Sequence, residues 1–177
     1  MARSILQIEI APQWSLRLSF ERRNDRYGHR VETLHDGRVS TWLASIEGEP
    51  DDDWPPSPPL QQLSIETLPD GVTAALLVGM AGKSHWSLSA HGDPQQGGFW
   101  FDAACRVRHV PQRLGASYEP VSPHESIAGR ALELRPLPYP ETPLKQEEFA
   151  IGVETPDSIE KPQTIRWKYW LGLEKEG

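Results

Sequence analysis

The sequence SHWSLSAHGDPQQGGFWFDAACRV, at residues 84–107, contains two runs of alternating side chains on either side of a polar loop. In the first run Trp86 and Leu88 alternate with histidine and serine, and in the second Phe99 and Phe101 begin a similar alternation. Successive side chains of a strand point to opposite faces of a sheet, so each run has one buried face and one face toward water or a cavity. The segment is therefore predicted to be a β-hairpin.

The same alternation recurs along the rest of the chain, and Gly, Pro and Asp-Gly turns separate the runs. Sequential strands without crossover helices indicate an antiparallel sheet protein. We predict an all-β fold of about nine to ten strands, either a β-sandwich or a closed β-barrel, with at most one short helical turn. The candidates for these strands outside the hairpin lie at residues 5–10, 14–20, 29–34, 39–47, 63–67, 72–80, 128–135, 148–153 and 165–174.

Five of these local predictions are specific enough to be tested by a structure. The nearly continuous apolar run at 72–80 predicts a central strand covered on both faces, with a short buried helix as the alternative. Loops are predicted at 21–28 and 110–125, and Thr142-Pro143 favours a helical turn over the residues that follow it. The strong strand at 165–174 is expected to close or cover a sheet edge.

Residues 48–59 form the one long irregular segment of the predicted domain, which spans 1–177. Four prolines between Pro55 and Pro59 exclude a helix and a central strand and favour polyproline II. We expect a stiff connector that lies over its own domain, with Trp54 as its anchor. Docking of this segment in an aromatic groove of a partner is the alternative.

Charge and cysteine content exclude several classes of protein. The formal net charge of -7 argues against nucleic-acid binding, which normally requires a basic surplus. Cys105 is the only cysteine, so an intramolecular disulfide and a multi-cysteine zinc site are impossible. No apolar run is long enough to span a membrane and no secretory signal is seen, so no membrane partner is expected and a cytoplasmic location is predicted.

The common catalytic motifs are absent, but one group of polar residues lies on the outer face of the predicted hairpin. His85 and Ser87 belong to the first strand, and Trp100, Asp102 and Arg106 to the second. Paired residues must share a face, so Asp102 is expected opposite His85, Ser87 or Ser89. We predict that the ligand-binding residues are His85, Ser87, Trp100, Asp102 and Arg106.

Two functions fit these residues. The first is a non-enzymatic module that binds a small ligand or a protein partner on a concave sheet face or in a barrel mouth. The second is a hydrolase-like enzyme with His85 as base, Asp102 as its orienting group and Ser87 as nucleophile. A regular sheet face offers no oxyanion hole and does not exclude water, which disfavours catalysis.

No cofactor and no metal site are predicted. His85 and His91 lie about 20 Å apart along an extended strand, too far to bind one ion. A further hypothesis is an assembly subunit that uses the Pro-rich segment and exposed rings among Trp42, Trp100 and Trp170. The sequence leaves open whether the protein is a monomer or a homo-oligomer.

Overall fold

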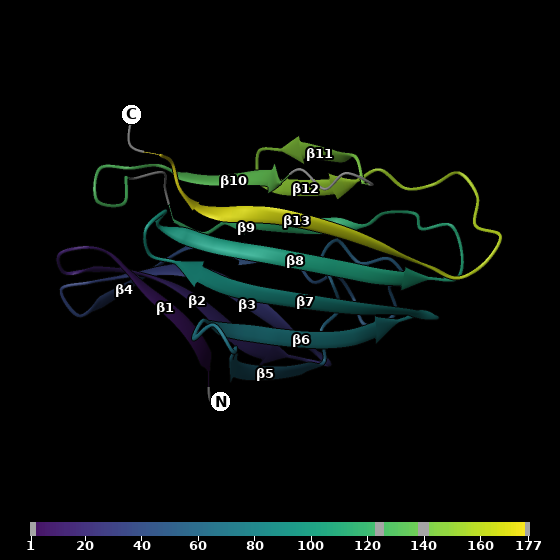
Figure 1. Ribbon diagram of the computed structural model, residues 1–177, viewed down its shortest axis with the longest axis horizontal. Coiled ribbons are helices and arrows are strands. Elements are labelled where there is room, and N and C mark those ends of the chain that lie inside the picture. Colours follow the sequence, from purple (N-terminus) through teal and green to yellow (C-terminus); the bar gives the residue numbers. More distant parts are fainter. Residues whose placement is uncertain (1–2, 123–125, 138–141, 176–177) are drawn as a thin grey trace.

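Two antiparallel β-sheets pack face to face in the computed structural model, which describes residues 3–122, 126–137 and 142–175 (Figure 1). The six-stranded sheet lies in front in Figure 1 and the seven-stranded sheet lies behind it. The two sheets end at strands β1, β11, β10 and β5 over the described residues and do not close on each other. The all-β prediction is confirmed, and of its two alternatives the structure has the sandwich and not the closed barrel.

The chain completes most of one sheet before it enters the other. The seven-stranded sheet has the order β1-β2-β3-β4-β9-β12-β11, with bounds β1 (Ser4–Ala11), β2 (Trp14–Arg23), β3 (Arg26–His35), β4 (Arg38–Ser45), β9 (Gly115–Pro120), β12 (Ala150–Val153) and β11 (Leu144–Glu147). The six-stranded sheet has the order β10-β13-β8-β7-β6-β5, with bounds β10 (Leu132–Leu137), β13 (Gln163–Leu173), β8 (Gly98–Val107), β7 (Ser84–Asp93), β6 (Thr73–Ala81) and β5 (Gln62–Thr67).

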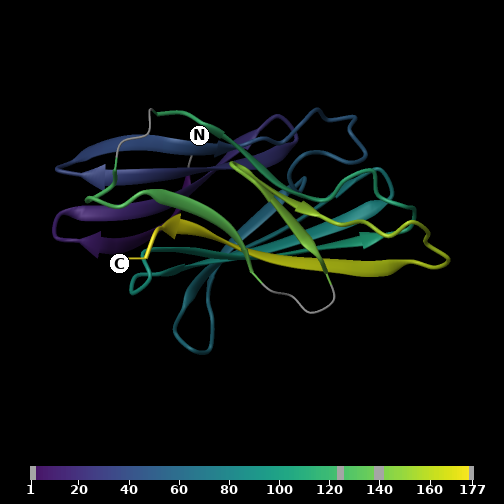
Figure 2. The same ribbon diagram turned by 90° about the horizontal axis from the view of Figure 1, so that it is seen from above.

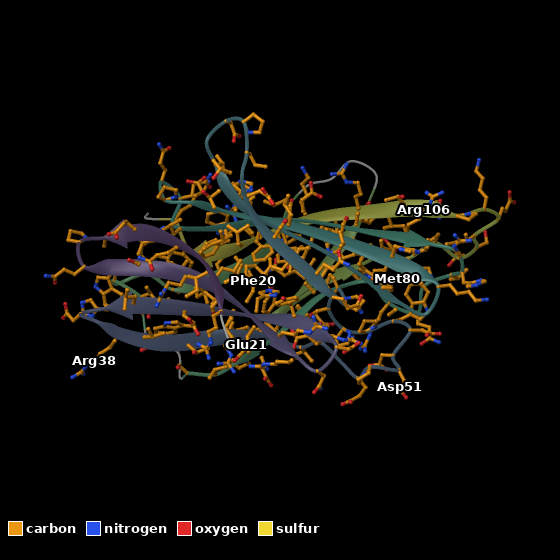
Figure 3. All side chains as sticks on the ribbon, turned by 90° about the horizontal axis from the view of Figure 1, so that it is seen from below. Phe20, Glu21, Arg38, Asp51, Met80 and Arg106 are labelled. Carbon is orange, nitrogen blue, oxygen red and sulfur yellow. The ribbon has the colours of Figure 1, made fainter. Side chains whose placement is uncertain are left out.

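The predicted hairpin is present as β7 and β8 at the centre of the six-stranded sheet. Leu88 pairs with Ala103 and Ala90 with Phe101, so the apolar residues of both strands share the inner face. The ring of Phe101 stacks on Tyr169 of the neighbouring strand, with centroids 4.6 Å apart. Figure 3 shows Phe20 of the opposite sheet between the two layers, where it is 1% exposed. One hydrophobic cluster thus joins both sheets.

The apolar run at 72–80 is a strand, β6, but only one of its faces is covered by the described chain. Leu77 on the inner face is 2% exposed. Leu76, Val78 and Met80 lie on the outer face and are 37%, 48% and 47% exposed. The prediction that both faces of this strand are covered is therefore wrong for these residues. The apolar face of each sheet points into the sandwich, and no described element lies over this part of the outer face of the six-stranded sheet (Figure 2).

Three predicted irregular or helical segments are strands. β2 and β3 extend through most of 21–28, because Asn24 adopts a positive φ of 54° and allows a tight turn with Asp25. The predicted loop at 110–125 contains β9, which pairs with β4 and β12; residues 123–125 lie outside the described residues. The expected helical turn after Thr142-Pro143 is the short strand β11, whose backbone pairs with β12.

The last strand, β13, does not close a sheet edge as predicted. It lies inside the six-stranded sheet, between β10 and β8, and its register with β8 runs from Gln163 to Gly172. Its inner face buries the rings of Trp167 and Tyr169, and its outer face carries Arg166 and Lys168. The described residues form thirteen strands, more than the nine to ten predicted, because short strands such as β9 and β11 carry little alternation.

The Pro-rich segment lies over its own domain, as predicted. The ring of Trp54 packs against Trp86, with centroids 5.8 Å apart. Ser57 is buried, and its hydroxyl donates to the carbonyl of Ser117 and accepts from the backbone N–H of the same residue. The connector passes so close to β6 that a Cβ on Gly79 would overlap the carbonyl oxygen of the last proline.

Candidate functional site

The outer face of the six-stranded sheet carries all five predicted ligand-binding residues. The β7–β8 register places His85 opposite Arg106, Ser87 opposite Ala104 and Ser89 opposite Asp102. Asp102 therefore has one of the three partners that the sequence allowed. His91 lies opposite Trp100 at the end of this row of pairs.

A trough runs along the strands of this face because its floor is made of small side chains. Ser87 and Ser89 of β7 and Ala104 of β8 form the floor, and longer side chains stand on both sides. Two adjoining depressions, of about 660 Å³ and about 510 Å³, make up the trough. They share the residues Gln62, Val78, Ser87, Ala104 and Thr164.

One wall of the trough is apolar. Leu76, Val78 and Met80 of β6 pair with Ser89, Ser87 and His85, so their side chains follow one another along the strand. They are three of the exposed large hydrophobic residues among the described part of the chain, and the other six lie elsewhere: Ile5, Val39, Ile46, Ile65, Val110 and Val121. A contiguous apolar stripe of this kind is typical of a binding surface, whereas single exposed residues are normal.

The opposite wall is charged. Arg166 Nη2 lies 3.0 Å and Lys168 Nζ 3.3 Å from Oδ2 of Asp102. Arg106 is exposed and donates to the hydroxyl of Thr164 at 3.3 Å. Among the described residues, this wall therefore brings the three cations Arg106, Arg166 and Lys168 together with the carboxylate of Asp102, in a chain of net charge -7.

The register does not assemble the predicted catalytic set. Asp102 lies opposite Ser89, and His85 is four residues further along β7, about 13 Å away in an extended strand. The carboxylate of Asp102 is instead held by Arg166 and Lys168. Asp102 therefore does not orient His85, and these two residues do not form the predicted base and orienting group beside Ser87.

The three tryptophans that the sequence could not place differ in exposure. Trp170 lies on the outer face yet is only 1% exposed, since its ring covers Gly98 and packs against Trp100 with centroids 4.9 Å apart. Trp100 is half-buried and donates from Nε1 to Asp93 at 3.3 Å. Trp42 is half-buried and donates to Thr33. They do not form a flat exposed set of rings.

Sequence reasoning missed both walls of the trough, which include Leu76, Val78 and Met80 on β6 and Arg166 and Lys168 on β13. The signal for β6 is its apolar outer positions, which the sequence pattern predicts to be core. The signal in β13 was the alternation of Arg166 and Lys168 with the buried rings of Trp167 and Tyr169, but the sequence did not say that this strand adjoins β8.

A second polar group missed in the sequence lies inside the core. His29 Nε2 and the hydroxyl of Tyr118 are 2.8 Å apart, and that hydroxyl is 2.9 Å from the hydroxyl of Tyr169. Burial lowers the pKa of His29 to about 4 and raises the pKa of both tyrosines. All three are therefore neutral and are buried away from ligands, so we interpret them as a structural network.

Neither a metal cluster nor a membrane-spanning helix is found in the described part of the chain. Over residues 3–122, 126–137 and 142–175, no three His, Cys, Asp or Glu side chains come close enough to hold a metal ion. Within the same residues no helix is long and apolar enough to cross a membrane.

The fold is an antiparallel β-sandwich, and the trough lies on the outer face of its six-stranded sheet. Comparison with protein-family models, curated proteins and solved structures found no match to this chain. The function is therefore inferred from the trough itself.

Proposed function

We propose that this protein is a non-enzymatic interaction module, and that the trough binds an amphipathic, acidic segment of a partner protein. The observation that carries the proposal is the uncovered outer face of β6. Its sequence has the composition of a strand buried on both faces, and Leu76, Val78 and Met80 are left exposed side by side. Burial of this stripe by a partner would remove apolar surface from water.

The charged wall supports an acidic partner. Arg106, Arg166 and Lys168 stand across the floor from the apolar stripe, so a ligand that fills the trough meets apolar groups on one side and cations on the other. A segment with apolar residues along one side and carboxylates along the adjacent side has the matching pattern. Such complementarity favours rapid association and selects the partner.

The shape of the trough supports a peptide rather than a compact small ligand. The apolar stripe from Leu76 to Met80 covers four residue steps, about 14 Å along the strand. The two walls, β6 and β13, are separated by β7 and β8, which corresponds to about 14 Å between strand axes. An α-helix with its side chains is about 10–12 Å wide, so a helical segment fits between the walls.

Met80 provides a direct test, because it is one of only two methionines in the chain. The probe is a synthetic helical peptide with leucine along one side and glutamate along the adjacent side. Spectra of the isotope-labelled methionine methyl groups are recorded during a titration with this peptide. We expect a saturable shift of the Met80 signal, and a weaker or absent shift with a peptide in which lysine replaces glutamate.

Two substitutions of equally exposed valines provide the control. Val78 is 48% exposed in the trough, and Val39 is 49% exposed on β4 of the other sheet. Val78→Asp should abolish the peptide-induced shift and Val39→Asp should leave it unchanged. If the Met80 signal does not move at millimolar peptide, or if both variants behave alike, the trough is not the binding surface.

The cytoplasmic location stays a prediction from the sequence, and the single cysteine, Cys105, fits it.

A further inference from the structure

Strand β5 is a free edge of the six-stranded sheet. Among the described residues it pairs with β6 and with no other strand, and of its six residues all but Leu63 are exposed. Figure 2 shows the β5–β6 hairpin projecting from the sandwich, away from the seven-stranded sheet. Strand β3 approaches this edge near the start of β5, where the backbone N–H of Tyr27 donates to the carbonyl of Leu60.

This edge lacks most of the features that normally prevent strands from pairing between molecules. Natural edge strands carry lysine, proline or a bulge, or are covered by another element. The sequence of β5 is QLSIET, its register with β6 shows no irregularity, and Glu66 is its only charge. Ile65 exposes 38% of its surface at this edge. The strand is therefore a ready template for a further strand.

The side chains of β5 are complementary to a second copy of themselves in one antiparallel register. If Ser64 lies opposite Ser64 of the partner subunit, then Leu63 faces Ile65 of the partner subunit, and Gln62 faces Glu66 of the partner subunit. The two-fold axis repeats both pairs. Apolar residues meet apolar residues, and each amide can donate to a carboxylate.

The neighbouring registers are less favourable. A shift by one residue would place outer-face residues opposite inner-face residues, which the pleat forbids. A shift that centres the pair on Ile65 places Leu63 opposite Thr67 of the partner subunit, and a further shift places two Glu66 carboxylates opposite each other. The register centred on Ser64 also ends before Leu60, where Tyr27 occupies the edge.

We propose that β5 pairs edge to edge with β5 of a second copy, which makes a symmetric dimer with one continuous sheet across both molecules. The contact is isologous and closes on itself, so it does not lead to fibres. It is independent of the proposed function, but it would extend the trough. Gln62 lines both depressions, and Glu66 of the partner subunit would stand beside it.

Charge substitutions at Gln62 test the register directly. The full chain is examined by sedimentation equilibrium at low ionic strength over a wide range of concentration. We expect a mass that rises from one chain to two. Gln62→Glu places carboxylates opposite Glu66 of the partner subunit twice and should raise the dissociation constant at least ten-fold, whereas Gln62→Lys should lower it. Gln95→Glu, in the exposed β7–β8 loop, changes net charge equally and should have no effect.

The opposite results would overturn the pairing. A wild-type chain that stays monomeric at all concentrations excludes it, and so does a dimer whose dissociation constant changes with neither Gln62 variant. The Val78→Asp variant should still dimerise, because its side chain lies in the trough and not at the edge. Failure of peptide binding and failure of dimerisation are therefore distinguished in the same set of proteins.

Discussion

The imidazole Nε2 of His29 lies 2.8 Å from the hydroxyl oxygen of Tyr118, between the two sheets of the sandwich. Phe20 and Phe101 flank the imidazole, with ring centroids 5.8 Å and 5.6 Å away. Aromatic rings therefore surround the imidazole, and burial lowers its pKa from 6.5 to about 4.

Acid should destabilise the fold through His29. The pKa of His29 is lower in the folded state than in the unfolded state, so between pH 6.5 and pH 4 the unfolded chain binds a proton that the folded chain does not. The free energy of unfolding should fall by about 3 kcal/mol across this range from this residue alone. Urea unfolding at a series of pH values measures the slope.

One variant isolates this contribution. His29→Phe should remove its part of the slope, because phenylalanine does not bind a proton. Burial raises the pKa of Glu47, which accepts a hydrogen bond from Ser45; its contribution has the opposite sign and is lost as pH rises through its folded pKa. A His29→Phe profile as steep as that of the wild type would show that other groups dominate acid unfolding.

Gly98 is required for the close contact between β8 and β13. A Cβ at Gly98 would lie 2.5 Å from the Cα of Gly172 and 2.5 Å from Cζ2 of Trp170. Gly98→Ala should therefore lower the free energy of unfolding by about 1–3 kcal/mol through overpacking. Gly152→Ala is the matched control, because its Cβ would meet nothing closer than 3.8 Å. Equal stability of the two variants in urea unfolding would contradict the contact.

Cys105 should be unreactive in the folded protein. It is fully buried on the inner face of β8, and burial raises the pKa of its thiol to about 12. Since the thiolate is the reactive form, labelling with an aromatic disulfide at mildly alkaline pH should require unfolding. The labelling rate should rise with urea in step with the unfolding rate. Rapid, stoichiometric labelling of the native chain would mean that β8 opens locally.

The sequence predicts the β7–β8 hairpin well because alternation with a period of two determines which face each residue occupies. It does not determine the register, since His85, Ser87 and Ser89 all satisfy the parity rule for Asp102. The loop decides among them. Asp93 accepts hydrogen bonds from the backbone of Gln95 and Gln96, and Gly97 donates to the carbonyl of Asp93, so that Asp93 pairs with Gly98.

The trough could not be predicted from the sequence, because it depends on how whole strands are ordered in the sheet. Outer-face residues of β6 look like core residues, and only the sheet order shows that the described chain leaves them uncovered. The cations of β13 reach the trough because this strand inserts next to β8 from the far end of the chain. Short strands such as β11 show too little alternation to be recognised.

Asp102 is expected to moderate the charge of the trough rather than to stabilise the fold. Its ion pairs with Arg166 and Lys168 lie at the surface, where such pairs contribute at most about 1 kcal/mol. Asp102→Asn should therefore change the free energy of unfolding by less than about 1 kcal/mol.

Asp102→Asn should also change peptide binding. Because it removes a carboxylate that pairs with two of the cations, it should strengthen binding of the acidic peptide several-fold, and the gain should shrink as salt is added. Asp157→Asn, an exposed residue outside the trough, makes the same change in net charge and should leave affinity unaltered. Weaker peptide binding by Asp102→Asn would mean that the carboxylate itself contacts the partner, and the trough would then recognise a cationic or hydrogen-bond-donating group at this point.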